Sequence, residues 1–230
     1  MVEMVPYRPL CIVDGCPKHA HGRDKYCSQH LHRVNTHGHP EQLPVTLKLA
    51  PYKQQITLWT ASADGMKAFN AIVASYEEAA KSFQRDAVAA HNEMMTTGIR
   101  HNTMHNQVAE IVSRTSRLKD SRKTVTQLLA LGLMLEDQPR SFRSDTAIFF
   151  QAVNVFNEDA NVRKKLYSKQ TGKIETVTRY GKKSARLHLG RWLMKNYVSL
   201  GIQLSRQWSK KLAQERRERE ELHSLIRASA

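Results

Sequence analysis

Three cysteines and one histidine near the start of the chain have the types and spacing of metal ligands. Cys11, Cys16, Cys27 and His30 follow the pattern C-x4-C-x10-C-x2-H, and they include every cysteine of the 230-residue chain. Thiolate and imidazole suit Zn²⁺, which binds four such ligands tetrahedrally, at about 2.3 Å for sulfur and about 2.0–2.1 Å for nitrogen. Because four protein ligands leave no place for a catalytic water, the spacing predicts a structural zinc site.

Two alternatives to this ligand set stay open from the sequence. His32 lies two residues beyond His30 and competes with it as the fourth ligand. The cysteines could instead be buried without metal, although this polar segment has few large apolar residues to fold around. In a reducing compartment, clustered thiols are more often metal ligands than disulfides. The histidines expected to stay in solvent are His19, His21, His32, His37 and His39.

A short helix is expected to carry two of the ligands. It runs from Ser28 to about Thr36 and ends at Gly38, a residue type that commonly caps helices in a left-handed conformation. The i, i+3 spacing of Cys27 and His30 places both on one face at the start of this helix.

The first forty or so residues resemble a small zinc-finger module found in many bacteriophage and mobile-element proteins. That module has the pattern C-x4-C, a loop ending in Arg-Gly-Leu-Cys, x2-His, and then Arg and Gly-x-Pro. The loop of this chain departs from it, because Gly22 and Arg23 are transposed and residues 24–26 are inserted or changed. The resemblance covers residues 8–42 and implies a DNA context rather than a particular reaction. The positions that match are Cys11, Cys16, Cys27, His30, Arg33, Gly38 and Pro40.

The rest of the chain predicts a mainly α fold, in which the small zinc finger precedes a multi-helix domain with one basic β-hairpin. A linker is expected after the zinc module, with Pro44 and Pro51 bounding a short strand at residues 45–49. The expected segments are the zinc module at 1–42, the linker at 43–62, the helical core at 63–160, the basic hairpin at 161–183, and a long carboxyl-terminal helix at 184–230 that packs on the core and exposes a charged end.

Apolar residues recur at intervals of three and four through residues 63–160, a spacing that predicts packed helices. The second of these helices is expected to expose Arg114, Arg117 and Lys119, whereas the third and fourth are expected to be buried. The predicted helices run from 63, after a cap at Ser62 or Asp64, to a stop at Gly98; from 102 to 118; from 121 to 135; and from a cap at Ser144 through residues 147–156.

The charge of the chain favours a polyanionic partner. There are 36 Lys and Arg residues against 21 Asp and Glu, for a formal net charge of +15. Eleven of the cations and a single acid, Glu175, fall within residues 161–195, so this segment holds a net +10. DNA is the expected partner and RNA the alternative. No apolar run approaches the roughly 18–20 residues that span a bilayer, and no signal-peptide pattern opens the chain, so we expect no membrane and a cytoplasmic location, which is the host cytoplasm if a phage encodes it.

A basic hairpin is predicted from alternating residues on either side of the turn at Gln170–Lys173. With the helix that follows, this ribbon could act as the wing of a winged DNA-binding domain, its cations lying along phosphates. The alternative is an ordinary solvated hairpin. The residues expected to contact nucleic acid are Lys18, Arg23, Arg33, Lys164, Lys165, Lys173, Arg179, Lys182, Lys183 and Arg186.

The last segment is expected to form one long helix from about Ser184, with an exposed, charged end that could dock on a partner. A helix-turn-helix with Gly201 in its turn is the alternative. That motif requires a small residue four positions before the glycine and apolar residues six and nine after it. The chain has Tyr197, Gln207 and Lys210 there. The residues expected to face inward are Trp192, Leu193, Leu200, Leu204, Trp208 and Leu212.

No pattern indicates a catalytic site, and the chain is expected not to be an enzyme. It lacks a phosphate-cradling loop, a nucleophile elbow and a dinucleotide fingerprint, and its paired acids are adjacent rather than spaced as metal ligands. Three His-Asn pairs leave a ββα-metal (HNH-like) nuclease as an alternative, although they fall on or between predicted long helices. These pairs are His91-Asn92, His101-Asn102 and His105-Asn106.

These patterns predict a phage or mobile-element DNA-binding protein with a structural zinc finger, acting in transcription or replication. A polymerase or another protein partner could contact the zinc module or the carboxyl-terminal helix. The alternative is a protein-interaction or scaffolding subunit of a nucleoprotein assembly, in which the positive charge only complements its surroundings.

Overall fold

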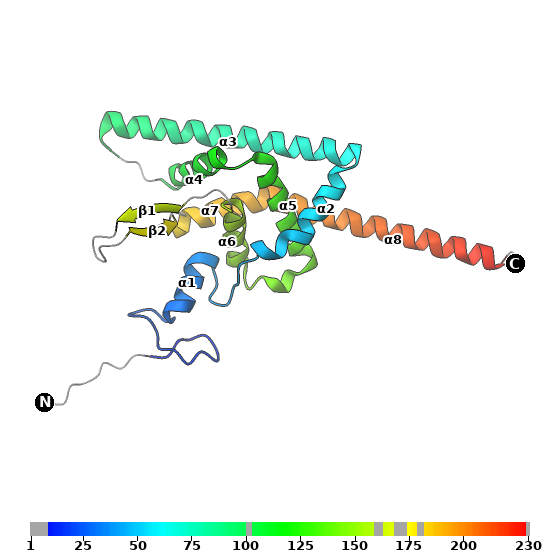
Figure 1. Ribbon diagram of the computed structural model, residues 1–230, viewed down its shortest axis with the longest axis horizontal. Helices are drawn as coiled ribbons and strands as arrows, with labels where there is room; N and C mark the ends of the chain where they lie inside the picture. The colour runs from blue at the N-terminus through cyan, green and yellow to red at the C-terminus, as the bar shows by residue number, and fades with distance from the viewer. Residues whose placement is uncertain (1–8, 100–102, 159–162, 168–173, 179–181, 229–230) are drawn as a thin grey trace.

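The structure is a computed structural model that describes residues 9–99, 103–158, 163–167, 174–178 and 182–228. Within these residues the protein is mainly α-helical, as expected, with one small hairpin (Figure 1). Among the described helices, none has both the length and the apolar composition that crossing a membrane requires.

The predicted core helices are confirmed, and polar caps set where they begin. Each cap side chain accepts a hydrogen bond from a backbone N–H in the first turn of its helix, which satisfies a donor that has no partner within the helix. The cap pairs are Ser62 with Gly65, Thr103 with Asn106, Asp120 with Lys123, and Ser144 with Ala147. The helices are α3 (Ala63–Thr97), α4 (Met104–Leu118), α5 (Ser121–Asp137) and α6 (Asp145–Phe156).

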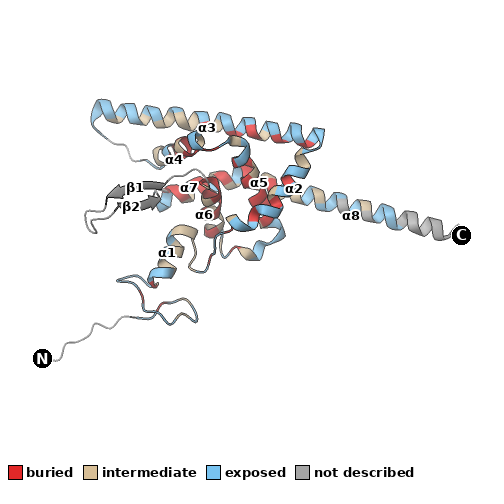
Figure 2. Cartoon of the chain, in the orientation of Figure 1, coloured by how far each residue is buried: buried red, intermediate tan, exposed pale blue. Residues whose placement is uncertain are grey.

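Helix α5 lies at the centre of the body because it is apolar on nearly every side. Leu128, Leu129, Leu131 and Leu133 are each at most 1% exposed, and α2, α3, α6 and α8 pack around them (Figure 2). Fully burying one such leucine contributes about 1.5–3 kcal/mol. This helix is therefore the central element against which α2, α3, α6 and α8 pack.

The segment expected to be a linker with a short strand is instead helical. It forms the 3₁₀ turn η1 (Thr46–Leu49) followed by α2 (Ala50–Thr60). Val45, Leu49 and Ile56 are at most 2% exposed and belong to the main hydrophobic core. The strand prediction was wrong because buried apolar residues in so short a run do not distinguish a strand from a helix.

The carboxyl-terminal helix is continuous, running as α7 (Lys183–Leu193), the π-helical turn η3 (Met194–Val198) and α8 (Ser199–Ala228). The helix-turn-helix alternative is therefore wrong, because Gly201 lies inside a helix. A side chain at Gly201 would place its Cβ 2.2 Å from the carbonyl oxygen of Leu129, so glycine lets α8 approach α5 closely. Beyond this contact α8 projects away from the body (Figure 1).

The residues expected to face inward on this helix pack against the core, except that the side chain of Leu212 lies outside the described part of the structure. Leu193 and Leu204 are buried. Trp192, Leu200 and Trp208 are partly buried against the same core.

The expected hairpin is present as β1 (Arg163–Tyr167) paired with β2 (Ile174–Thr178) in antiparallel register. Arg163 pairs with Thr178 and Tyr167 with Ile174. The predicted turn at Gln170–Lys173 lies outside the described residues.

Candidate metal centre

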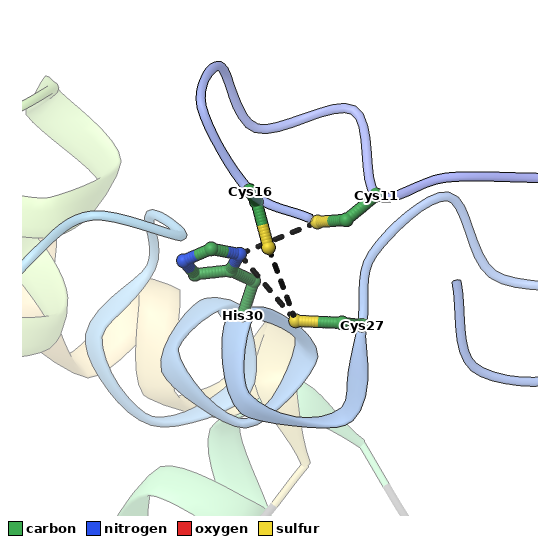
Figure 3. A group of neighbouring side chains, drawn as sticks. All are labelled: Cys11, Cys16, Cys27 and His30. Carbon is green, nitrogen blue, oxygen red and sulfur yellow. Dashed lines mark hydrogen bonds between the residues drawn. The ribbon is translucent and has the colours of Figure 1, made fainter. Parts of the chain in front are cut away.

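The four predicted ligands lie together, with their donor atoms all within 4.8 Å of one another (Figure 3). Cys11 Sγ is 3.3 Å and Cys27 Sγ 3.5 Å from Nδ1 of His30. Cys16 Sγ is 3.9 Å from Cys27 Sγ. His32 is exposed and lies outside this group, so the fold selects His30 as the fourth member. Among the described residues this is the one group of three or more His, Cys, Asp or Glu side chains arranged to hold a metal ion.

Two local structures present the four side chains. Cys11 and Cys16 flank a tight turn: the backbone N–H of Cys16 donates to the carbonyl of Val13 at 3.1 Å, and that of Cys11 donates to the carbonyl of Lys18, beyond the turn, at 2.8 Å. Cys27 is the N-cap of α1 (Ser28–His37), and His30 lies one turn along, as the i, i+3 spacing predicts. We call residues 9–42, which contain both structures, the Cys-His module.

The environment lowers the pKa of one thiol of the cluster and raises that of another. Burial opposes ionisation of Cys11, but hydrogen bonds from two backbone N–H groups and from the His30 and Cys16 side chains outweigh it and lower the pKa of Cys11 to about 6. At Cys16 a backbone hydrogen bond lowers the pKa, but burial and the two neighbouring thiols together raise it. Three thiolates this close repel one another unless a positive charge lies between them. The cluster can therefore serve as a four-coordinate metal site.

Arg186 of α7 joins the carboxyl end of α1 to the helical body. Its guanidinium donates to the carbonyl oxygens of Asn35 at 2.7 Å and Thr36 at 2.9 Å, and to Oδ1 of Asn154 at 3.0 Å. The side chain is only 4% exposed, and its guanidinium carbon lies 4.4 Å from the ring centroid of Phe150. The last carbonyls of a helix lack partners within the helix and carry partial negative charge, so a cation is favoured there. The expectation that Arg186 contacts nucleic acid is corrected, because it is a buried structural contact.

His37 and Gly38 complete this contact between the module and the body. Nδ1 of His37 accepts hydrogen bonds from Asn154 Nδ2 at 3.2 Å and Gln151 Nε2 at 3.3 Å, so the ring is half-buried rather than solvated. Burial, followed by nearby positive charges, lowers the pKa of His37 and favours the neutral ring that these bonds require. Gly38 has a φ of 80°, and a Cβ there would lie 2.8 Å from the carbonyl oxygen of Thr146. The module is therefore packed against α6 rather than tethered to it.

The other cations expected at a nucleic-acid surface are less buried wherever their side chains are described. The basic start of α7 lies one turn before Arg186, the residue that contacts α1. The exposed residues are Lys18, Arg23, Lys182 and Lys183, and Arg33 is half-buried. Lys164 and Lys165 lie in β1, placed by their backbone, whereas Lys173 and Arg179 lie outside the described residues.

Lys119 was expected to be exposed but is buried at 8% exposure. Its ammonium group donates to the carbonyls of Val155 at 3.0 Å and Phe156 at 3.1 Å, and also to Oε1 of Gln127. It therefore satisfies the carboxyl end of α6 in the way that Arg186 satisfies that of α1. No local sequence signal marks either residue, because their partners are distant in the chain.

The His-Asn pairs are distributed over two helices. His91 and Asn92 lie on α3, and His105 and Asn106 lie on α4, where His105 Nε2 is 3.0 Å from Oδ2 of Asp86. The pair at residues 101–102 falls outside the described part of the chain. Neither described pair belongs to a group of metal-binding geometry.

No protein-family model, curated protein or solved structure matches the chain. The resemblance of residues 8–42 to the phage zinc-finger module therefore depends on the ligand spacing and on the arrangement of the four side chains.

Proposed function

We propose that Cys11, Cys16, Cys27 and His30 hold a structural Zn²⁺ ion. The bond lengths of a tetrahedral zinc site imply edges of roughly 3.8 Å between two sulfurs and roughly 3.6 Å between sulfur and nitrogen. The distance between the sulfurs of Cys16 and Cys27 is 3.9 Å, and the sulfurs of Cys11 and Cys27 are 3.3 and 3.5 Å from Nδ1 of His30. These three distances fit a zinc ion with little movement, and the remaining donor pairs lie within 4.8 Å. With all four positions taken by protein, it would stabilise the module and activate no water.

The zinc-loaded protein binds nucleic acid, with DNA as the expected ligand and RNA as the alternative. The observation that carries this proposal is the charge balance. Even if every one of the 21 acids neutralised a cation, fifteen of the 36 Lys and Arg residues would have no acidic partner. Such cations attract a phosphate backbone and gain affinity by releasing its counterions. The exposed lysines and arginine on the module and at the start of α7 offer one such surface.

The setting of this activity follows from the resemblance of the module to those of phage and mobile-element proteins. It supports a role at DNA in transcription or replication, beside a polymerase or similar machine in the host cytoplasm. The ion is structural in this proposal, so the protein positions a nucleic acid and carries out no reaction on it.

Two measurements on the purified full chain test the proposal. Elemental analysis should find one zinc per chain, and a chain without stoichiometric metal contradicts the structural site. Binding to labelled duplex DNA, single-stranded DNA and RNA should weaken by roughly 10³- to 10⁵-fold between 50 and 200 mM salt if six to ten phosphates are neutralised. A shallow salt dependence contradicts the nucleic-acid role.

A second candidate function is a protein-interaction subunit of a nucleoprotein assembly. It is favoured by α8, whose carboxyl-terminal part leaves the body and is available to another chain (Figure 1). This candidate predicts that the protein co-purifies with a protein partner through α8 and binds free DNA weakly.

A further inference from the structure

A hollow of about 580 Å³ lies between α3 and α4. In Figure 1 these two helices lie on the opposite side of the body from α1 and the Cys-His module. The α3 residues that line the hollow recur every three or four positions, so they share one face of that helix. The lining includes Lys81, Gln84, Arg85, Val88 and Asn92 of α3 and Arg117 of α4.

Three cations of this hollow lack acidic partners. Lys81, Arg85 and Arg117 are exposed, and none forms an ion pair with another described residue. Lys81 and Arg85 are four residues apart on one helix, where like charges destabilise each other. This repulsion is relieved when an anion binds between them.

Among the described residues no acid lines the hollow, and the acids nearby in sequence form no ion pair with its three cations. Asp86 lies 3.0 Å from His105, and Glu110 lies 2.7 Å from Arg114. Glu77 and Glu78, one turn before Lys81, form no ion pair with a described residue. The hollow therefore presents net positive charge to solvent.

The two walls of the hollow are held in a fixed relation. Gln84 Nε2 donates to Ser116 Oγ at 2.9 Å, which ties α3 to α4. Next to it in sequence, Phe83 packs edge-on against Trp192 at 5.2 Å between ring centroids, which anchors this part of α3 to α7. The cationic side chains thus extend from a packed framework, and an anion can bind without rearrangement of the helices.

We propose that this hollow, the α3–α4 basic groove, binds a phosphodiester segment of duplex DNA. The proposal rests on the nucleic-acid function proposed above and adds a second contact surface, separate from the module and the start of α7. Arginine forks match the geometry of phosphate oxygens and lysine adds a mobile positive charge. The volume exceeds that of a lone phosphate group and is open, as a continuing backbone requires, and Val88 offers an apolar contact for a sugar.

The test compares two triple variants of the zinc-loaded full chain, each with three fewer positive charges than wild type. The groove variant is Lys81→Gln, Arg85→Gln and Arg117→Gln. The control is Lys53→Gln, Arg114→Gln and Arg206→Gln, three cations that each pair with a glutamate in the structure. Binding to a labelled 20-base-pair duplex is titrated with salt, and melting temperature and zinc content verify that both variants fold.

If each groove cation contacts one phosphate, the slope of log K against log salt should fall by about 2.7 in the groove variant, which corresponds to a loss of roughly 500-fold in affinity at 0.1 M salt. The control should retain most of the wild-type slope. Equal slopes for the two variants overturn the groove and leave the proposed function standing. Wild-type protein that binds single-stranded DNA or RNA but no duplex also overturns the groove alone, whereas wild-type protein that binds none of the three nucleic acids overturns both. A separate arm uses tripolyphosphate. If it raises the melting temperature of wild type but not of the groove variant, while the duplex slope is unchanged, the groove takes small polyphosphates and the phosphodiester assignment is wrong.

Discussion

Replacing Arg186 with glutamine should weaken the attachment of the Cys-His module to the helical body. The guanidinium donates three hydrogen bonds, two to the last carbonyls of α1 and one to Asn154. A shorter neutral amide cannot reach the same acceptors, so the Asn35 carbonyl loses this donor, and the Thr36 carbonyl keeps the hydrogen bond from Asn154 Nδ2 at 3.1 Å but loses the one from Arg186. Since the contact joins residues about 150 positions apart in the chain, its loss acts directly on the tertiary arrangement.

The magnitude follows from these contacts. A hydrogen bond involving a charged group contributes about 1.5–3 kcal/mol. The three are not additive, and removing the arginine also removes the cost of burying its charge. We therefore expect a net loss of about 3 kcal/mol in the free energy of unfolding, which is a large part of the roughly 5–15 kcal/mol typical of a folded domain.

Urea denaturation of the metal-loaded protein measures this loss, with Arg191→Gln as the matched control. Arg191 lies on the same helix and its guanidinium is 5.7 Å from the ring of Phe149, but its side chain is exposed. Its replacement should cost less than about 1 kcal/mol. Arg186→Lys keeps the charge without the fork and should be intermediate.

Two results would refute this reasoning. One is an Arg186→Gln variant as stable as wild type, or no less stable than the Arg191→Gln control. The other is a variant of unchanged stability that binds DNA more weakly, which would return Arg186 to a nucleic-acid surface. Hydrogen exchange adds a local test, because amides of α1 should lose protection while the metal content is retained.

Three further predictions concern the metal, a helix contact and pH. His30→Ala should lose stoichiometric metal in elemental analysis whereas His32→Ala keeps it, and the reverse result would show that the fourth ligand is misassigned. Gly201→Ala should destabilise the protein by about 1–3 kcal/mol in thermal unfolding, because the added Cβ would lie 2.2 Å from a backbone oxygen of α5. The control is Gln203→Ala at an exposed neighbouring position, and an equal effect of the two substitutions would contradict the close contact. Burial raises the pKa of Tyr197 to about 12 from an ordinary value of 10.0, so its phenol ionises first in the unfolded chain. The contribution of this residue to stability is therefore intact below about pH 10 and declines between pH 10 and pH 12. Tyr197→Phe should flatten that decline in urea titrations from pH 9 to pH 11, and identical pH profiles would rule out the buried phenol as its source.

Features that depend on a few neighbouring residues were predictable from the sequence. The spacing of the cysteines and His30 depends on one turn and one helix start, and the structure brings those side chains together. The caps at Ser62 and Ser144 and the stop at Gly98 likewise act within one helical turn, and they define the helices as expected.

Features that depend on distant partners were decided only by the tertiary structure. In the sequence, Arg186 and Lys119 have no feature that separates them from surface cations. In the structure, Arg186 donates to the end of a helix 150 positions away, and Lys119 donates to the end of a helix 36 positions away. Gly201 could be a turn residue from the sequence alone, and only the structure shows that it is needed for the close contact between α8 and α5. Local spacing indicates which residue types could bind a metal, whereas packing between elements determines which side chains are buried and which stay exposed.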